Sequence, residues 1–124
     1  MQGVEPSPLD AETVCHLTTT GRVSGRPHEI EIWFTALGDS LYLISGGGAD
    51  SDWVQNLGSD PVATVRVGDD TIPVVGRVPV HPGEERTVAV DRLHAKYADQ
   101  VTGTRDDWRR NAFIVALDVH PHTR

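Results

Sequence analysis

The sequence predicts a mainly β domain with added helices, an α+β fold. About six antiparallel strands would form a small barrel, and two to three helices would pack on it. Short apolar runs of strand length recur along the chain, and tight turns rich in Gly, Asp and Ser separate most of them. Such short turns join antiparallel neighbours, because parallel strands need a crossover of about a dozen residues or more.

One domain is expected in a chain of 124 residues, and we place it at 9–119. Residues 1–8 contain two prolines and little to bury, so they are expected to be a flexible head. Residues 120–124 are expected to be a frayed tail. Near the head, Ser7 or Asp10 is expected to cap a short helical turn.

Six segments have the composition of strands. They are expected at 14–20, 28–37, 41–45, 62–67, 71–80 and 112–119. The first segment also fits a short helix running into a strand. Within the fifth segment, Pro73 indicates a sheet edge or a bulge, because proline cannot donate a hydrogen bond to a neighbouring strand.

The segment 28–37 has the clearest alternation of apolar and polar residues. Ile30, Ile32 and Phe34 fall on one face, which therefore belongs to the core. Glutamates, a threonine and Trp33 fall on the other face. A large aromatic side chain there either covers the end of the barrel or lines a site.

Two helices and one short polar segment are expected. Residues 53–57 follow Asp and Ser residues that can cap a helix, and a glycine and a proline end it. A second helix begins after His81, and its apolar residues recur at spacings of three and four as far as Val101. Residues 104–110 fit either a polar loop or a helical turn.

The composition argues against several classes of partner. A formal net charge of −7 argues against a nucleic-acid surface, which needs many Lys and Arg side chains to meet the phosphates. No apolar run approaches the ~20 residues of a membrane span, and the N-terminus has no signal-peptide pattern. A single cysteine cannot form an internal disulfide, so a cytoplasmic location is expected.

Neither the cysteine nor the six histidines predict a metal site. Cys15 lies in an apolar strand segment and is expected to be a small buried thiol, although beside His16 it also fits a thiolate or a metal ligand. The histidines lack the spacing of a zinc site, apart from His120 and His122 in the tail. We therefore expect no metal.

The segment 18–27 is the strongest candidate for a ligand site. Three threonines lead into a turn in which two glycines remove side-chain bulk, and Arg22 and Arg26 add positive charge. Thr20 and Ser24 add hydroxyl groups. These groups together fit an anion such as a phosphate, and the alternative is a β-hairpin with two solvated arginines.

Three consecutive glycines, Gly46, Gly47 and Gly48, directly follow the strand at 41–45. A backbone without side chains can approach a flat or charged group closely. The alternative is a flexible connector.

Four motifs in this order resemble a known family, the deazaflavin-dependent nitroreductases, which are small reductases that use coenzyme F-420. The motifs are Thr-Thr-Thr-Gly-Arg at 18–22, Ser-Gly-Arg-Pro at 24–27, Tyr-Leu-Ile-Ser-Gly-Gly at 42–47 and Asp-Trp-Val-Gln-Asn-Leu at 52–57. The resemblance covers roughly residues 14–119. It implies the split β-barrel shared with pyridoxamine-phosphate oxidases, and a homodimer.

The resemblance also implies where the coenzyme binds. The turn would hold its phosphate and the start of its polyglutamate tail, and the glycine run would lie against the deazaflavin ring. Trp53 and Asn56 would close that side, although Trp53 also fits a core plug for its short helix. The implied cofactor-binding residues are Thr20, Arg22, Val23, Ser24, Gly25, Arg26, Pro27, Ser45, Gly46, Gly47, Gly48, Trp53 and Asn56.

The implied reaction is hydride transfer from reduced coenzyme F-420 to a small electron-poor acceptor, of the quinone, enone or nitroaromatic type. The protein would supply placement and exclusion of water. Backbone N–H groups near Gly46 and Gly47 would stabilise charge that develops on the ring. No proton donor is identified, and Ser45 is the one residue considered for that catalytic role.

Val23 departs from the family pattern, because many members carry a lysine at this position. One cationic contact with the coenzyme tail is therefore missing. This leaves two alternatives open: an oxidoreductase of the same fold that binds FMN, and a non-catalytic protein that binds or carries the coenzyme. Tyr97 and Trp108 are candidates for the substrate pocket only by their place in the chain.

Overall fold

The computed structural model describes residues 8–119, and every structural statement below concerns that range. Its strands are β1 (Cys15–Thr20), β2 (Pro27–Ile32), β3 (Phe34–Leu37), β4 (Ser40–Ile44), β5 (Val62–Val67), β6 (Asp70–Arg77) and β7 (Ile114–Val119). Its helices are α1 (Asp52–Ser59), α2 (Glu84–Lys96) and α3 (Arg105–Asn111), with short 3-10 helices η1 (Pro8–Ala11), η2 (Gly48–Asp50) and η3 (Ala98–Gln100).

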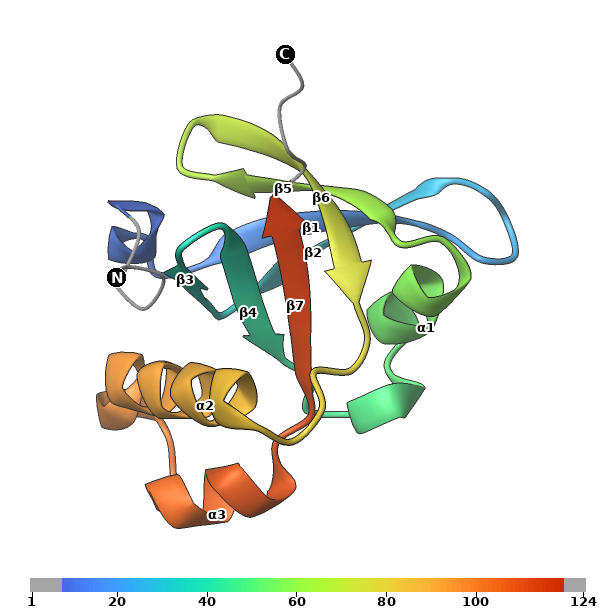
Figure 1. The fold of residues 1–124 in the computed structure, drawn as a ribbon. Coiled ribbons are helices and arrows are strands. Elements are labelled where there is room, and N and C mark those ends of the chain that lie inside the picture. Colours follow the sequence, from blue (N-terminus) through green and yellow to red (C-terminus); the bar gives the residue numbers. More distant parts are fainter. Residues whose placement is uncertain (1–7, 120–124) are drawn as a thin grey trace.

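All seven strands belong to one antiparallel sheet, in the order β2-β1-β5-β6-β7-β4-β3. β2 and β3 follow one another in the chain yet lie at opposite edges of the sheet. The sheet is therefore strongly curled, and the chain itself joins its two edges (Figure 1). This is the half-barrel expected of an α+β split barrel, so the predicted fold class is confirmed.

The expectation of one continuous strand at 28–37 was wrong. The segment divides at Trp33, because β2 pairs with β1 whereas β3 pairs with β4. The alternation nevertheless continues across the break, since Ile30, Ile32 and Phe34 all contact the main core. The division raises the number of strands from the expected six to seven within the described residues.

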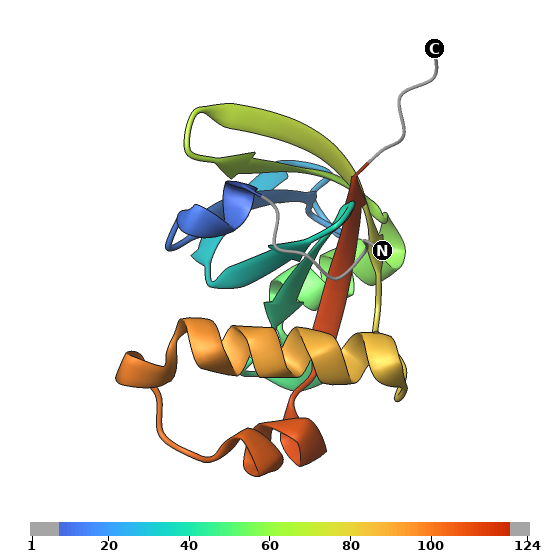
Figure 2. The same ribbon diagram turned by 60° about the vertical axis from the view of Figure 1, so that its left-hand side comes forward.

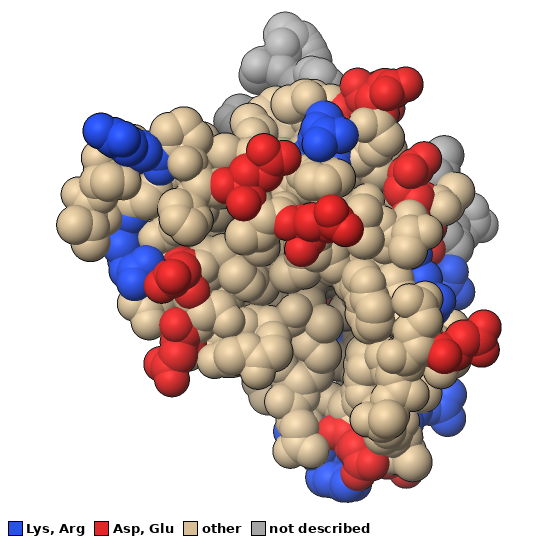
Figure 3. Space-filling model, turned by 180° about the vertical axis from the view of Figure 1, so that it is seen from behind, with Lys and Arg blue, Asp and Glu red and all other residues tan. Residues whose placement is uncertain are grey.

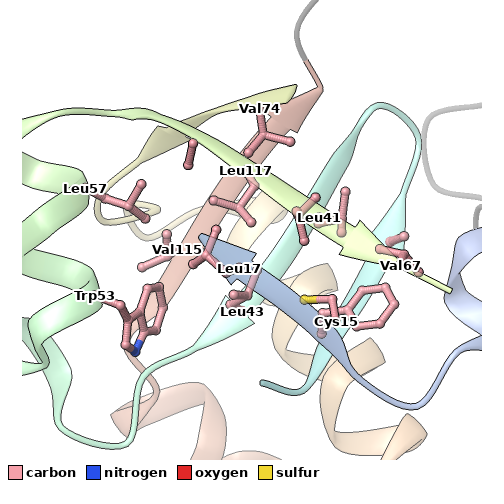
Figure 4. Close-up of a cluster of buried hydrophobic side chains, with 14 of the residues drawn as sticks. Cys15, Leu17, Leu41, Leu43, Trp53, Leu57, Val67, Val74, Val115 and Leu117 are labelled. Atoms are coloured by element: carbon pink, nitrogen blue, oxygen red, sulfur yellow. The ribbon is translucent and has the colours of Figure 1, made fainter. Parts of the chain in front are cut away.

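Two hydrophobic cores lie on either side of the β3-β4-β7 part of the sheet. The main core fills the inside of the curl and includes Leu17, Leu43 and Leu117 (Figure 4). The second core lies under α2, which packs on β3, β4 and β7 (Figure 2). These three strands are consequently buried on both faces of the sheet.

The second helix ends earlier than expected. α2 stops at Lys96, with Tyr97 as its C-cap, and η3 then turns the chain toward α3, so Val101 lies outside the helix. The segment 104–110 adopts the helical alternative. Thr104 and Asp107 form a reciprocal capping box at the start of α3.

Asp10 does not cap a helical turn, as had been expected, but contacts β3 and α2. Its Oδ1 accepts hydrogen bonds from the Thr35 hydroxyl and from the backbone N of Ala36, both at 2.9 Å. The same oxygen accepts a hydrogen bond from Lys96 Nζ at 3.1 Å. The carboxylate thus serves tertiary contacts instead. Ser7, the other capping candidate, lies outside the described residues.

The other strands lie close to their expected positions, although β6 ends at Arg77 and not at Val80, and β7 begins at Ile114 and not at Ala112. Residues 15–20 form a strand and not a helix. Pro73 pairs with Thr64 of β5, and pairing of β6 with β7 begins only at Val74, so the proline lies where β6 has one neighbour. The expectations for the head and for the tail at 120–124 lie outside the described residues, except that Pro8 begins η1.

Cys15 is a buried free thiol, as expected, and burial raises its pKa to about 12. Among the described residues, no group of three or more His, Cys, Asp or Glu side chains is arranged to hold a metal ion. In the same part of the chain, no helix is both long enough and apolar enough to cross a membrane.

Candidate functional site

The turn between β1 and β2 is closed by its own backbone. Gly21 N donates to Arg26 O at 2.8 Å, and Gly25 N donates to Gly21 O at 2.8 Å. Gly25 has a φ of 73°, a conformation that L side chains rarely adopt, which explains the glycine. The Ser24 hydroxyl accepts from Arg26 N at 3.1 Å, so it also serves the turn.

Asn56 of α1 fastens this turn to the barrel. Its Oδ1 accepts hydrogen bonds from Arg22 N at 3.2 Å and from Arg22 Nη1 at 2.8 Å. Its Nδ2 donates to the Thr19 hydroxyl at 3.1 Å. Asn56 and Thr19 are both 2% exposed. Asn56 is therefore a buried connector that positions Arg22.

Arg22 also reaches the N-terminal end of α1. Its Nη2 lies 3.2 Å from Oδ1 of Asp52, in an ion pair at the surface. A cavity of about 180 Å³ opens at this junction, and it is lined by Gly21, Arg22, Val23, Ser24, His28, Asp52 and Asn56. The anion-binding turn predicted from the sequence thus has a small cavity beside it, with one cation and one carboxylate in its wall.

Two further members of the turn face outward. Val23 is 93% exposed. The guanidinium of Arg26 has no partner within the part of the chain that the structure describes, so its charge is available to a ligand. On the other side, Thr20, Gly25 and Pro27 line a separate cavity of about 260 Å³ together with Val62 and other residues of β1 and β5.

The glycine run after β4 is organised by two serines. The Ser45 hydroxyl donates to Gly48 O at 2.8 Å and lies 2.7 Å from the Ser51 hydroxyl. A Cβ on Gly47 would lie 2.6 Å from the Ser51 hydroxyl oxygen, and Gly48 has a φ of 62°. These two glycines are therefore required by the loop itself. The Ser45 hydroxyl closes the loop and is not free to act as a proton donor.

Gly46 differs from its neighbours because space is open around it. A Cβ built there would meet no atom within 4 Å. Among the described residues, the backbone N–H groups of Gly46 and Gly47 have no acceptor. They are thus two unpaired donors, of the kind predicted to face a ring carbonyl oxygen.

Ser45 and Gly46 open onto a larger cavity of about 450 Å³. It is lined by Trp33, Ile44, Ser45, Gly46, Thr102, Gly103, Asp107, Trp108, Asn111 and Ala112. Trp33 lines this cavity, which is compatible with the second of its two predicted alternatives, and Trp108 lines it too. Figure 3 shows that the lower part of the face seen from behind is hollowed and formed mainly by uncharged atoms.

The other aromatic candidates lie elsewhere. Tyr97 is 1% exposed and stacks on Trp33, with ring centroids 4.2 Å apart and planes 2° from parallel. Trp53 points into the main core beside Leu17 and Leu43, so it acts as a core plug (Figure 4). Of the α3 residues that line the cavity, Trp108 was named as a candidate by its place in the chain, whereas Asp107 and Asn111 were not predicted.

One charged side chain lines the larger cavity. The backbone N–H of Thr104 donates to Oδ2 of Asp107 at 3.1 Å, and this bond, the Thr104 side chain and nearby Arg110 keep the pKa of the Asp107 carboxyl below its ordinary value. Asp107 is therefore ionised at neutral pH. The cavity has aromatic walls, the unpaired backbone N–H of Gly46 in its lining and a single negatively charged side chain.

Comparisons with known proteins give the family and the fold of this chain. The family model described as F420H(2)-dependent quinone reductase matches residues 2–113. No curated protein gave a significant match. A conserved hypothetical protein from Mycobacterium tuberculosis is similar in structure, with a TM-score of 0.72 and 17% identity over 96% of this chain and 84% of its own.

Two other solved structures show that proteins of different description share this fold. The heme storage protein HutZ from Vibrio cholerae has a TM-score of 0.71 at 12% identity, over 92% of this chain and 86% of its own. A structure described as an F420-H2 dependent reductase has a TM-score of 0.59 at 21% identity, over 86% of this chain and 94% of its own. These likenesses show the fold, whereas the family model covers most of the sequence. The chain therefore belongs to the F420H(2)-dependent quinone reductase family.

Proposed function

We propose that this protein is a reductase that binds coenzyme F-420 and transfers a hydride from it to a small electron-poor acceptor of the quinone, enone or nitroaromatic type. One observation carries the proposal: the loop after β4 joins a cation-bearing turn to a tryptophan-lined cavity. At one end Asp52 contacts Arg22, and at the other Ser45 and Gly46 line the cavity.

The residues around the turn fit the anionic end of the coenzyme. Arg26 offers an unpaired guanidinium, and the wall of the small cavity includes Arg22. A guanidinium is the side chain best suited to bind a phosphate oxygen through paired hydrogen bonds. The Asp52 carboxylate pairs with Arg22 and would compete with a phosphate for its guanidinium. We therefore expect Arg26 to contribute more than Arg22 to phosphate binding.

The glycine run and the larger cavity fit the ring. About 450 Å³ lies within the usual range for small-molecule sites. The unpaired N–H of Gly46 would donate to a ring oxygen, and Trp33 and Ile44 would exclude water from one wall. When bound in reduced form, the coenzyme supplies the hydride.

The side chains that line the larger cavity indicate the source of the proton that the reduced acceptor takes up. The Ser45 hydroxyl is hydrogen-bonded to Gly48 O and to the Ser51 hydroxyl, and Asp107 is ionised at neutral pH. No other titratable side chain among the described residues lines the larger cavity. We assign the proton taken up by the reduced acceptor to solvent water at the open mouth of the cavity.

The proposal extends to assembly and location. The family resemblance supports a homodimer that acts in the cytoplasm. Val23 and Val62 are the exposed large hydrophobic residues among those described, at 93% and 61% exposure, and both lie near the turn. Light scattering of the wild type beside Val23→Lys would test whether this end of the molecule forms the dimer contact.

The test of the reaction is anaerobic mixing of reduced coenzyme with 1,4-naphthoquinone, with and without the protein. We expect oxidation of the coenzyme that depends on protein concentration. If reduced FMN supports turnover and reduced F-420 does not, the protein is instead an FMN-binding oxidoreductase. If F-420 binds tightly but no acceptor oxidises it, the protein is a coenzyme carrier.

A further inference from the structure

We propose that Asp10 and Lys96 form a latch at the split of the barrel, where the chain crosses from β2 to β3, and that this latch holds Trp33 in the wall of the larger cavity. The same latch keeps Cys15 closed off from solvent. Breaking it would open this part of the molecule while the rest of the fold stays intact. The inference goes beyond the proposed function and does not depend on it, because it concerns the wall of the cavity and not its occupant.

The Tyr97 hydroxyl lies where the β1–β2 ladder would otherwise continue. The register of that ladder, extended by two residues beyond its Cys15 end, would place Thr13 opposite Phe34. The link between these two residues runs through the tyrosine. Phe34 N donates to the Tyr97 hydroxyl at 3.0 Å, and that hydroxyl donates to Thr13 O at 2.6 Å. β3 therefore parts from β1 around one inserted oxygen atom, which keeps the two segments joined.

The outer edge of β3 is covered by the two side chains of the latch. β3 lies at the edge of the sheet with β4 as its neighbour, so alternate residues direct their backbone groups away from the sheet. Ala36 N donates to Asp10 Oδ1 at 2.9 Å. Phe34 O accepts a hydrogen bond from Lys96 Nζ at 2.9 Å. Since open backbone groups at a sheet edge can pair with another chain, the latch takes the place of a neighbouring strand.

The latch is a largely buried ion pair. Lys96 Nζ lies 3.1 Å from Asp10 Oδ1, and each side chain is 15% exposed. The ammonium also lies 3.9 Å from the centroid of the fully buried Phe34 ring. Removing one partner of a buried pair is strongly destabilising, because the other charge is left without its counter-ion in an apolar setting. A single substitution at Asp10 should therefore open the split.

Two groups that can be measured separately lie behind the latch. Trp33 stacks on the Tyr97 ring, with centroids 4.2 Å apart, and Tyr97 directly follows Lys96 in the chain. Cys15 lies two residues after Thr13, and its side chain is fully buried in the main core (Figure 4). Opening the latch would remove the support of the Trp33 ring and expose the one thiol of the chain.

The first test is the reaction of Cys15 with a chromogenic disulfide, without urea and at urea concentrations below the unfolding transition. In the wild type we expect a slow rate that rises steeply with urea, because modification requires global unfolding. In Asp10→Ala we expect a rate roughly a hundredfold higher without urea and nearly independent of urea, because local opening exposes little surface. Glu12→Gln removes an exposed carboxylate two residues away and should behave like the wild type.

Asp10→Asn provides a milder change in case Asp10→Ala does not fold. The asparagine keeps an oxygen for Ala36 N and loses the charge opposite Lys96. We expect the same weak dependence on urea with a smaller gain in rate, roughly tenfold over the wild type.

The second test follows the indole N–H signals of the three tryptophans by ¹⁵N NMR, with assignment from single Trp→Phe variants. In the Asp10 variants the Trp33 signal should shift. The signal of Trp53 in the main core and that of Trp108 on α3 should stay in place, because neither ring contacts the latch. This pattern separates a local loss of the Trp33 support from a general loosening of the fold.

An Asp10→Ala rate equal to that of the wild type would overturn the inference. So would a faster rate with the wild-type dependence on urea, since Asp10 would then stabilise the fold as a whole. The same two criteria apply to Asp10→Asn if Asp10→Ala does not fold, and failure of both variants to fold would show that the opening is not local. An unshifted Trp33 signal, or equal shifts of all three indole signals, would contradict the link between the latch and the cavity wall.

Discussion

The side-chain oxygen of Asn56 accepts two hydrogen bonds from Arg22, one from the backbone N at 3.2 Å and one from Nη1 at 2.8 Å. Through Nδ2 the same side chain binds the Thr19 hydroxyl. A single buried amide thus fixes the β1–β2 turn to α1. Together with the surface ion pair between Arg22 and Asp52, this contact sets the position of the turn relative to α1.

Replacing Asn56 should therefore loosen the turn and destabilise the fold. Asn56→Ala leaves the Thr19 hydroxyl and the Arg22 N–H without their partner, and we expect a loss of about 1–3 kcal/mol in the free energy of unfolding. Urea denaturation measures this. The control is Gln55→Ala, an exposed neighbour on the same helix, which should change stability by less than about 0.5 kcal/mol. Equal losses for the two variants would contradict the assigned role.

The two arginines of the turn should behave differently. Arg26→Ala removes a guanidinium without a protein partner, so we expect coenzyme binding to weaken by about 1.5–3 kcal/mol while the melting temperature stays constant. Arg22→Ala should weaken binding and also lower the melting temperature, because Asn56 and Asp52 lose their partner. Calorimetric titration with F-420 and thermal melts measure both effects.

The control for both arginine variants is Arg66→Ala. Arg66 pairs with Glu29 at 3.7 Å on the exposed face of the sheet and lines none of the three cavities described above. It should leave the dissociation constant unchanged. The role given to Arg26 is contradicted if Arg26→Ala binds the coenzyme as tightly as Arg66→Ala does.

An ion-pair cluster that joins β6, β7 and α2 should govern stability in acid. Arg77 binds Glu85 and Asp118, each at a shortest distance of 2.6 Å, and these bonds hold the pKa of both carboxyls below their ordinary values. The cluster therefore stabilises the fold above the ordinary carboxyl pKa of about 4. That contribution is lost as the pH falls toward the lowered native values.

Arg77→Met should consequently flatten the acid limb of the stability curve. Unfolding measured by urea from about pH 6 down to pH 3 should show a shallower decrease for this variant than for the wild type. Arg66→Met, which disrupts a more distant surface pair, should follow the wild-type slope. A variant curve parallel to that of the wild type would show that the cluster does not control acid stability.

Cys15 should be protected from thiol reagents. Its pKa of about 12 keeps the thiol protonated at pH 8, and the side chain is fully buried. Reaction with a chromogenic disulfide should therefore proceed only at the rate of unfolding, and become fast in denaturant. Rapid modification of the native protein would mean that β1 opens locally.

The β-rich fold could be predicted because its signals are local. Alternation at Ile30, Ile32 and Phe34 identified the core face correctly, and it persists across the break at Trp33. The break itself could not be predicted. The pattern of apolar residues is the same on both sides, and only the distant partner strands, β1 and β4, show that the chain crosses from one sheet edge to the other.

Part of the candidate site could be predicted, because some of its residues also carry local signals in the sequence. Gly46 and Arg26 carry a local signal, since glycine runs and bracketing arginines are visible in the sequence. In the α3 wall, Trp108 was named by its place in the chain, whereas Asp107 and Asn111 carry no local signal, because their position at the cavity depends on the packing of α3 against α2. Asn56 was named as a ring contact, whereas its bond to Arg22 depends on residues that are distant in the sequence.

Equilibrium binding of oxidised coenzyme F-420, compared in the same calorimetric experiment with FMN, tests the central claim most directly. The account predicts saturable binding of F-420 that is tighter than that of FMN and is weakened in Arg26→Ala but not in Arg66→Ala. Absence of F-420 binding, or affinity that is the same in Arg26→Ala as in the wild type, would contradict a coenzyme site built on the β1–β2 turn and the glycine run.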